Sequence, residues 1–239
     1  MRIIGHRGAR GEAPENTLAG FQYLHDLGIR AVEFDVRQLP DETLVVMHDD
    51  NFIRTAGVVQ DLYACSKADL DRYNQASIWT DWPAQVTPLL NQALTLIAAF
   101  EHIEVEIKAV EHRDEAERLI NSLLKQLQDP AHLHQIVITS FDPQVLLAAQ
   151  HYAPQFRRGL LIENPRLKHP IELAQDLGCH QIGWMDQLAS EHAIAASHAA
   201  GLAVSVWTVN DLERALQLKA LGVEGLITDF PQRMQALFA

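Results

Sequence analysis

Residues 31–36 read AVEFDV, a short run in which apolar and acidic residues alternate. Successive side chains of a strand point to opposite faces, so Glu33 and Asp35 share one face while the valines and the phenylalanine share the other. In a closed barrel, the apolar face would pack against helices and the two carboxylates would point inward. Taken alone, the run is more typical of a strand whose polar face is half exposed.

Residues 103–108, IEVEIK, repeat this pattern further along the chain. Glu104, Glu106 and Lys108 share one face, and the intervening valine and isoleucine share the other. Two inward-facing groups of acids on neighbouring strands would repel each other unless a cation lies between them. Carboxylate oxygens suit Mg²⁺ or Ca²⁺, whereas the histidine and cysteine spacings typical of zinc sites do not accompany these acids. The two runs together therefore favour a metal site inside a barrel.

The rest of the chain supports the barrel, because short β-rich runs alternate with helical stretches. Thr87-Pro88 and Asp142-Pro143 are typical helix starts, and residues 210–213, NDLE, have a capping-box arrangement that begins at Asn210. Alternation of this kind predicts parallel pairing, and eight strands are the number that closes a TIM-type (β/α)8 barrel. The predicted strands cover residues 2–6, 31–36, 103–108, 135–141, 158–163, 180–185, 203–209 and 225–230.

One region interrupts the alternation. Residues 38–86 contain a short strand, TLVVMHD, followed by a polar, turn-rich stretch. We interpret residues 1–239 as a single barrel domain with a small inserted subdomain at about 47–86, between the second and third barrel strands. A connection of this length is usually functional, although a simple surface elaboration is the alternative.

Composition limits the classes of function. The chain has 239 residues, with 19 basic and 31 acidic residues and a net charge of −12, which argues against a nucleic-acid or anionic-membrane surface. No signal-peptide pattern or membrane-length apolar run is visible, so we expect a cytoplasmic protein without membrane insertion. Cys65 and Cys179 are expected to be free thiols.

Several polar residues lie where barrel strands end. His6 ends the first strand and His48 ends LVVMH, so both would reach the carboxyl mouth of the barrel, where barrel active sites form. Arg7 and Lys108 would bring positive charge to the same mouth, where arginine can bind a phosphate through two N–H groups. Two imidazoles beside one metal can serve as general base and general acid. The other histidines, such as His25, His102, His132 and His192, are expected on exposed helices or loops and receive no role.

The motifs GHRGARGEAPENT, EFDV, VVMHD and VEIK, followed by TSFD, WTVN and GVEGLITDFP, occur in this order along nearly the whole chain. In this order they resemble the glycerophosphodiester phosphodiesterase family, and the short form is similar to its cytosolic bacterial members. The resemblance implies a hydrolase that uses one divalent cation to convert glycerophosphodiesters to sn-glycerol 3-phosphate and an alcohol. Mg²⁺ is the first expectation for the cation, with Ca²⁺ and Mn²⁺ as alternatives, and the partner is a small-molecule substrate.

The resemblance also implies residue roles. It makes Glu33, Asp35 and Glu106 the metal ligands, His6 and His48 the catalytic pair, and Arg7 and Lys108 the phosphate contacts. Glu15 and Asn16 of PENT would support the site from behind. Trp207 of WTVN points inward by strand parity and would form an apolar wall for the glycerol carbons, with a core aromatic as its alternative.

Several questions stay open at this stage. They are the preferred alcohol, the assignment of acid and base between His6 and His48, attack by water or by the substrate's own hydroxyl, the role of Glu104, and the oligomeric state. Two alternative functions use the same residues: a lysophospholipase D-like hydrolase of larger phosphodiesters, and a non-catalytic barrel that binds phosphate or metal.

Overall fold

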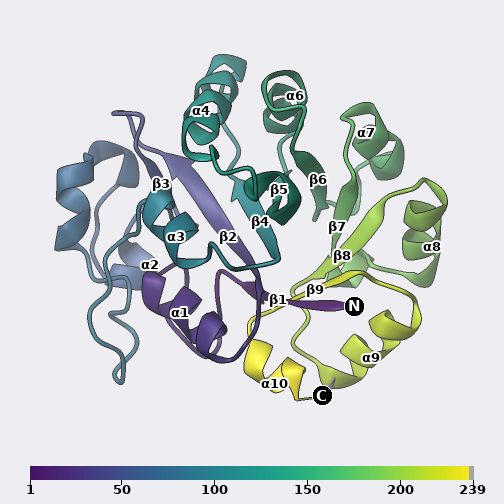
Figure 1. Cartoon of the computed structure of the whole chain (residues 1–239), viewed down its shortest axis with the longest axis horizontal. Helices are drawn as coiled ribbons and strands as arrows, with labels where there is room; N and C mark the ends of the chain where they lie inside the picture. Colours follow the sequence, from purple (N-terminus) through teal and green to yellow (C-terminus); the bar gives the residue numbers. More distant parts are fainter. Residues whose placement is uncertain (237–239) are drawn as a thin grey trace.

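The chain folds as an α/β barrel in which parallel strands alternate with helices (Figure 1). The computed structural model describes residues 1–236, and within them eight parallel strands pair side by side and close where β1 meets β2. These strands are β1 (Arg2–His6), β2 (Ala31–Gln38), β4 (His102–Ile107), β5 (Ile136–Ser140), β6 (Arg157–Ile162), β7 (Gln181–Met185), β8 (Ala203–Trp207) and β9 (Gly225–Thr228). The predicted TIM-type (β/α)8 barrel is therefore confirmed.

Helices form a ring around the strands, and α10 lies against β1 (Figure 1). Asp142 caps α6 by accepting a hydrogen bond from a backbone N–H of the first turn, and Pro143 takes the first helical position, as the sequence predicts. The helices are α1 (Leu18–Asp26), α3 (Leu90–Leu96), α4 (Arg113–Gln126), α5 (His132–Gln135), α6 (Pro143–Tyr152), α7 (Pro170–Asp176), α8 (Glu191–Ala199), α9 (Leu212–Ala220) and α10 (Pro231–Gln235). Within residues 1–236, none combines the length and apolar character that a membrane crossing requires.

The predicted capping box at Asn210 is wrong by one residue. The N-cap of α9 is Asp211, whose side chain accepts a hydrogen bond from the backbone N–H of Arg214 at 2.8 Å. The side chain of Asn210 is used elsewhere, because it donates to a carboxylate oxygen of Asp229 at 2.8 Å. A local capping pattern cannot reveal this competition, since the two partners are far apart in sequence.

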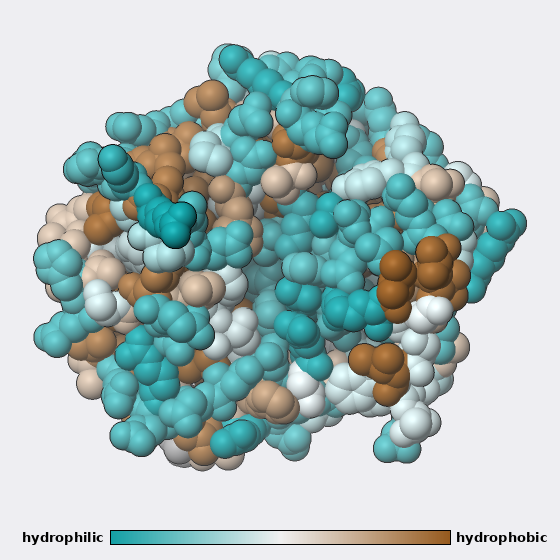
Figure 2. All heavy atoms as spheres, turned by 180° about the vertical axis from the view of Figure 1, so that it is seen from behind, coloured by the Kyte–Doolittle hydropathy of each residue, from teal (hydrophilic) through white to brown (hydrophobic). Residues whose placement is uncertain are grey.

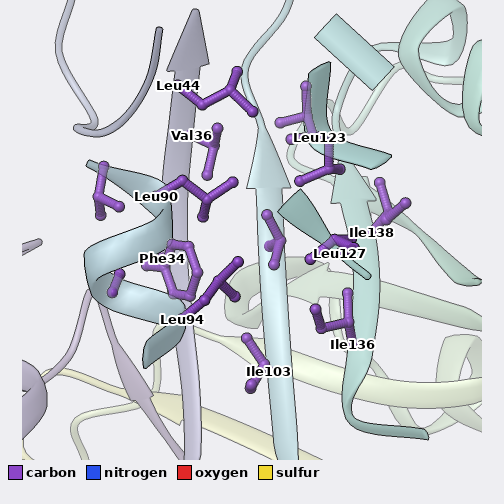
Figure 3. Close-up of a cluster of buried hydrophobic side chains, with 14 of the residues drawn as sticks. Phe34, Val36, Leu44, Leu90, Leu94, Ile103, Leu123, Leu127, Ile136 and Ile138 are labelled. Atoms are coloured by element: carbon purple, nitrogen blue, oxygen red, sulfur yellow. The ribbon is translucent and has the colours of Figure 1, made fainter. Parts of the chain in front are cut away.

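The outward face of β2 packs as its alternation predicts. Val32, Phe34 and Val36 are completely buried, and Figure 3 shows Phe34 among leucines of α3, with apolar side chains from β4, α4 and β5 beside them. Full burial of one such side chain contributes roughly 1.5–3 kcal/mol to the free energy of unfolding. This layer between strands and helices forces Glu33 and Asp35 to the inner face.

Deep inside the barrel, Glu104 has a partner that the sequence did not suggest. Glu104 is fully buried, and one of its carboxylate oxygens lies 3.0 Å from Nε2 of His102. The prediction that His102 lies on an exposed element is wrong, because this residue begins β4 and shares the inward face with Glu104. His102 thus provides the hydrogen-bond partner that a buried carboxyl group requires.

The chain between β3 (Leu44–Val46) and α3 lies outside the ring, on the left in Figure 1. It contains α2 (Ile53–Ala56) and two short 3₁₀ helices, η1 (Leu62–Ala64) and η2 (Lys67–Arg72). Its buried apolar residues pack with two residues that precede it, Leu39 and Val45. The separate small cluster is made by Leu39, Val45, Met47, Phe52, Leu62, Cys65 and Leu70. Figure 2, seen from the opposite side, has groups of hydrophobic residues toward the edge where this segment lies. The extent of an inserted subdomain at 47–86 stays a prediction.

We predict that Glu104→Ala lowers the free energy of unfolding by about 2–4 kcal/mol, because it leaves His102 buried without a partner and creates a void. Urea unfolding followed by circular dichroism measures the loss. Glu104→Gln keeps an oxygen that can accept from His102, so it should lose less than half as much. Equal losses in the two variants would contradict a role for the hydrogen bond.

Candidate active site

Strand register brings the predicted site residues to one end of the barrel. His6, the last residue of β1, aligns with Glu33 of β2, and Asp35 of the same strand aligns with Glu106 of β4. Because these strands are parallel, their carboxyl ends meet at the same mouth. Residues from three separate parts of the sequence therefore converge there. In the space-filling view of Figure 2, hydrophilic residues gather in the middle of the visible face.

Three carboxylates form a tight acidic cluster. One oxygen from each of Glu33, Asp35 and Glu106 lies within 4.8 Å of the others, and all three side chains are buried. Burial and the neighbouring Asp35 raise the pKa of Glu33 well above its ordinary value, and they raise the pKa of Glu106 to about 7. Burial alone would also raise the pKa of Asp35, but the positive charges of Lys108 and Arg7 hold it below its ordinary value.

This cluster fits a divalent cation. Oε1 of Glu33 is buried and has no hydrogen-bond partner, which is costly for a carboxylate unless another positive group occupies the space beside it. The donor set consists of carboxylate oxygens, the ligand type that Mg²⁺, Ca²⁺ and Mn²⁺ prefer. Glu33, Asp35 and Glu106 are thus the residues that could hold such an ion.

His6 lies beside the cluster and is held from behind by a carboxylate. Its Nδ1 is 2.6 Å from Oδ1 of Asp229, while its Nε2 is 4.0 Å from Oε2 of Glu33. Burial lowers the pKa of His6 below its ordinary value, an effect that Asp229 partly opposes. The second oxygen of Asp229 accepts the Asn210 side-chain N–H at 2.8 Å, so the carboxylate is itself fixed.

Asp229 and Asn210 are absent from the predicted site, although a signal for them exists. Asp229 follows the last residue of β9, and Asn210 follows β8 by three residues, so both come from carboxyl ends of barrel strands. In the sequence, Asn210 belongs to the motif WTVN and Asp229 to GVEGLITDFP, and neither motif indicates a separate role for them. The same rule that selects His6 at the end of β1 selects Asp229 on the neighbouring strand.

His48 approaches from the segment after β3. Its Nδ1 is 2.6 Å from Oδ1 of the adjacent Asp49, and its side chain is 35% exposed. Arg37 of β2 donates from Nε and Nη2 to the backbone oxygen of His48 at 2.9 and 2.6 Å. Arg54 donates from Nε to the other oxygen of Asp49 at 2.8 Å. Burial alone would raise the pKa of Asp49, but hydrogen bonds from His48 and Arg54 lower it below its ordinary value.

Arg7 and Lys108 lie against the acids. Nζ of Lys108 is 2.5 Å from Oδ1 of Asp35 and also bonds to Glu106. Nε of Arg7 is 3.3 Å from Oδ2 of Asp35, and the backbone N–H of Arg7 donates to Glu33 at 3.0 Å. The backbone of Arg7 is left-handed, with φ at 50°, a strained conformation for an arginine that this set of contacts holds in place.

Glu15 and Asn16 contact the site residues rather than the cavity. Nδ2 of Asn16 donates to Oδ2 of Asp35 at 2.7 Å. Glu15 accepts a hydrogen bond from Arg7 at 3.0 Å and two from Arg54 at 2.6 and 2.7 Å. The structure therefore places both residues directly behind groups of the predicted site.

A cavity of about 100 Å³ opens at the centre of these groups. Its charged side holds His6, Arg7, Glu33, His48, Glu106, Lys108 and Glu163, and its apolar side holds Phe141, Leu161, Trp207 and Ile227. Nε1 of Trp207 donates to the backbone oxygen of Gly183 at 3.1 Å, and its ring lies edge-on to Phe141 with centroids 5.3 Å apart. All the predicted catalytic, metal, phosphate and wall residues except Asp35 line this one space, and Asp35 lies immediately behind Lys108.

Comparison with known proteins adds an independent observation. A model of the glycerophosphoryl diester phosphodiesterase family matches residues 6–233. A glycerophosphodiester phosphodiesterase from Caldanaerobacter subterraneus is 27% identical over 238 residues, which cover 97% of this chain and 95% of that protein. The human lysophospholipase D GDPD1 is 26% identical, with 97% and 84% covered. An Oleispira antarctica phosphodiesterase, solved with the product sn-glycerol-3-phosphate, is similar with 26% identity and a TM-score of 0.88, over 100% of this chain and 96% of that one.

We predict that the protein binds one Mn²⁺ ion at this cluster and that Glu106→Gln weakens the affinity at least about tenfold, a loss typical even of groups behind metal ligands. Loss of the free Mn²⁺ signal in electron paramagnetic resonance measures binding without any need for activity. Glu104→Gln is the matched control, since it makes the same change two residues earlier on β4, and it should leave the affinity unchanged. Equal affinity in wild type and Glu106→Gln would contradict the assignment.

Proposed function

The chain belongs to the glycerophosphoryl diester phosphodiesterase family and is a glycerophosphodiester phosphodiesterase, and we propose that it cuts its substrates to sn-glycerol 3-phosphate and an alcohol. The observation that carries this product assignment is the single cavity lined by two histidines, two cationic side chains and two of the three clustered carboxylates, with the third, Asp35, directly behind Lys108. Each histidine has its own carboxylate partner, an arrangement suited to paired proton transfer. We further propose that the enzyme acts on a small-molecule substrate in the cytoplasm.

Glu33, Asp35 and Glu106 would hold one divalent cation, with Mg²⁺ as the first candidate and Ca²⁺ or Mn²⁺ as alternatives. When bound, such an ion neutralises phosphate charge and lowers the pKa of a coordinated hydroxyl group. The buried Oε1 of Glu33, which has no hydrogen-bond partner, supports this role.

Arg7 and Lys108 would orient the phosphate and stabilise the negative charge that grows on its oxygens during the reaction. Both side chains line the cavity, and both already contact Asp35. Asp35 and Glu15 would hold them in position, so that little reorganisation is needed when the substrate arrives. On the opposite side, Trp207 and Phe141 would pack against the glycerol carbons.

His6 would act as the general base. A proton on Nδ1 donated to Asp229 leaves Nε2 as the acceptor, and this atom faces Glu33, beside the place where a nucleophile would bind. The lowered pKa of His6, caused mainly by burial, keeps the ring neutral and able to accept a proton near pH 7.

His48 would act as the general acid. It is the more exposed of the two rings, and the carboxylate of Asp49 orients it through the contact with Nδ1. In this assignment, the proton of the nucleophile passes to His6 while the oxygen of the nucleophile bonds to phosphorus. The bond from phosphorus to the alcohol oxygen then breaks, and that oxygen takes a proton from Nε2 of His48.

The proposed reaction is tested by release of glycerol 3-phosphate from glycerophosphodiesters, coupled to its dehydrogenase. We expect no release after treatment with EDTA and recovery when Mg²⁺, Ca²⁺ or Mn²⁺ is added back. His48→Ala should lose activity by roughly 10²–10⁴-fold with any of these ions. Folded protein that releases nothing with any ion, across several alcohols, would reject the proposal.

The acid and base assignments predict different responses to the leaving group. For glycerophosphocholine, His6→Ala and His48→Ala should each lower kcat by roughly 10²–10⁴-fold. With glycerol p-nitrophenyl phosphodiester, whose phenolate leaves without protonation, His48→Ala should lose less than about tenfold, while His6→Ala keeps its full loss. Stopped assays of both substrates provide the comparison, with the exposed His25→Ala as the control that should change neither rate. Equal recovery of the two histidine variants would overturn the assignment.

A further inference from the structure

A second and larger cavity, of about 550 Å³, adjoins the candidate active site. Lys108 lines both cavities, so the larger cavity lies beside the place where the proposed phosphate contact would be made. The walls of the larger cavity come from the end of β2 and the turn after it, the segment after β3, the loop after β4, and α4. A cavity of about 100 Å³ is too small for a whole diester, so part of the substrate needs space beyond it.

Arg37 supplies an unusual positive charge to this wall. Its guanidinium donates to the backbone oxygen of His48 and, from Nη1, to the hydroxyl of Tyr63 at 2.8 Å. Both acceptors are uncharged oxygens, and within residues 1–236 no carboxylate pairs with Arg37. A guanidinium has more N–H groups than these bonds use, so further donors remain for a ligand.

Tyr63 adds a hydroxyl that can still donate. Because the phenol oxygen accepts the Arg37 N–H, its own hydrogen is free to bond to a ligand oxygen. The ring is partly exposed, and it is the single aromatic side chain in the wall formed by the described residues. A quaternary ammonium group is usually bound by several aromatic faces, and this wall offers one.

Hydrogen-bond acceptors complete the wall. Glu111 lines the cavity with an exposed carboxylate, and across residues 1–236 it has no cationic partner. Asp50 lines it as well, and one of its oxygens accepts a single hydrogen bond from Asn51. Donors from Arg37 and Tyr63 thus face acceptors from Glu111 and Asp50, a mixture that matches hydroxyl groups, which both donate and accept.

We propose that this cavity binds the alcohol half of the substrate and favours a polyhydroxylated alcohol, such as glycerol or a cyclitol, over a quaternary ammonium alcohol. Arg37 and Tyr63 then determine specificity on the donor side of the cavity, and Glu111 does so on the acceptor side. The inference rests on the proposed hydrolysis of glycerophosphodiesters and adds the chemical class of the leaving alcohol.

The test compares kcat/KM for glycerophosphoglycerol, glycerophosphoinositol and glycerophosphocholine in the full-length protein. Wild type should favour the two polyol diesters over glycerophosphocholine by at least about tenfold, a ratio that two or more hydrogen bonds to uncharged groups can provide. Tyr63→Phe keeps the ring and removes the hydroxyl, so it should lower kcat/KM for the polyol diesters about fivefold more than for glycerophosphocholine. Tyr23→Phe makes the same change at a tyrosine outside the cavity, where the hydroxyl bonds to Gln232, and should alter none of the values.

The outcomes separate the inference from the function on which it rests. Hydrolysis of all three diesters with no preference for polyols, or an equal loss on all three in Tyr63→Phe, overturns the inference and leaves the proposed function intact. Absence of hydrolysis of every diester, in folded protein supplied with a divalent cation, overturns the proposed function and the inference with it.

Discussion

Crowding of like charges at the barrel mouth is the constraint on which the rest of the site depends. Glu33, Asp35 and Glu106 are buried within a few ångströms of one another, and three carboxylates cannot all be charged there without compensation. Lys108 and Arg7 compensate Asp35, so its pKa is lowered, whereas the pKa values of Glu33 and Glu106 are raised. The uncompensated charge is therefore localised on the two glutamates, where a proton or a cation must supply the balance.

The two histidines beside these carboxylates are held in position in different ways. His6 ends a barrel strand, and its partner Asp229 directly follows the neighbouring strand β9, so the pairing of β1 with β9 brings the two residues together. His48 lies on the segment that leaves the barrel, and no ladder holds it. Its position depends instead on Arg37, which ties its backbone oxygen to β2, and on Arg54, which holds Asp49. Charged hydrogen bonds thus hold His48 and Asp49 against the barrel, in addition to the apolar cluster that joins the segment to Leu39 and Val45.

Strand parity predicts much of this arrangement from the sequence. The alternation around Phe34 is enough to place Glu33 and Asp35 inside the barrel, because the helices must bury the apolar face. Parity fails to find Asp229 as a partner of His6, since 223 residues separate the two and only the closure of the barrel brings them together. His102 lies one residue before the predicted strand, which begins at Ile103, so the parity that places Glu104 inside was not extended to it. Arg37 was missed because its acceptor is a backbone oxygen, which no side-chain pattern reports.

An acidic protein that binds an anionic phosphate must concentrate positive charge locally. Here, buried acidic side chains hold the cationic side chains close together. Glu15 is buried and contacts Arg7, Arg10 and Arg54, so one carboxylate gathers three guanidinium groups behind the cavity. Asp35 does the same for Lys108 on the other side. Each of these acids offsets the repulsion that would otherwise separate the cations, and each limits the reorganisation needed when phosphate binds. The excess of acidic residues and the capacity to hold a phosphate are therefore compatible, because at this mouth the buried carboxylates are what hold the cations in place.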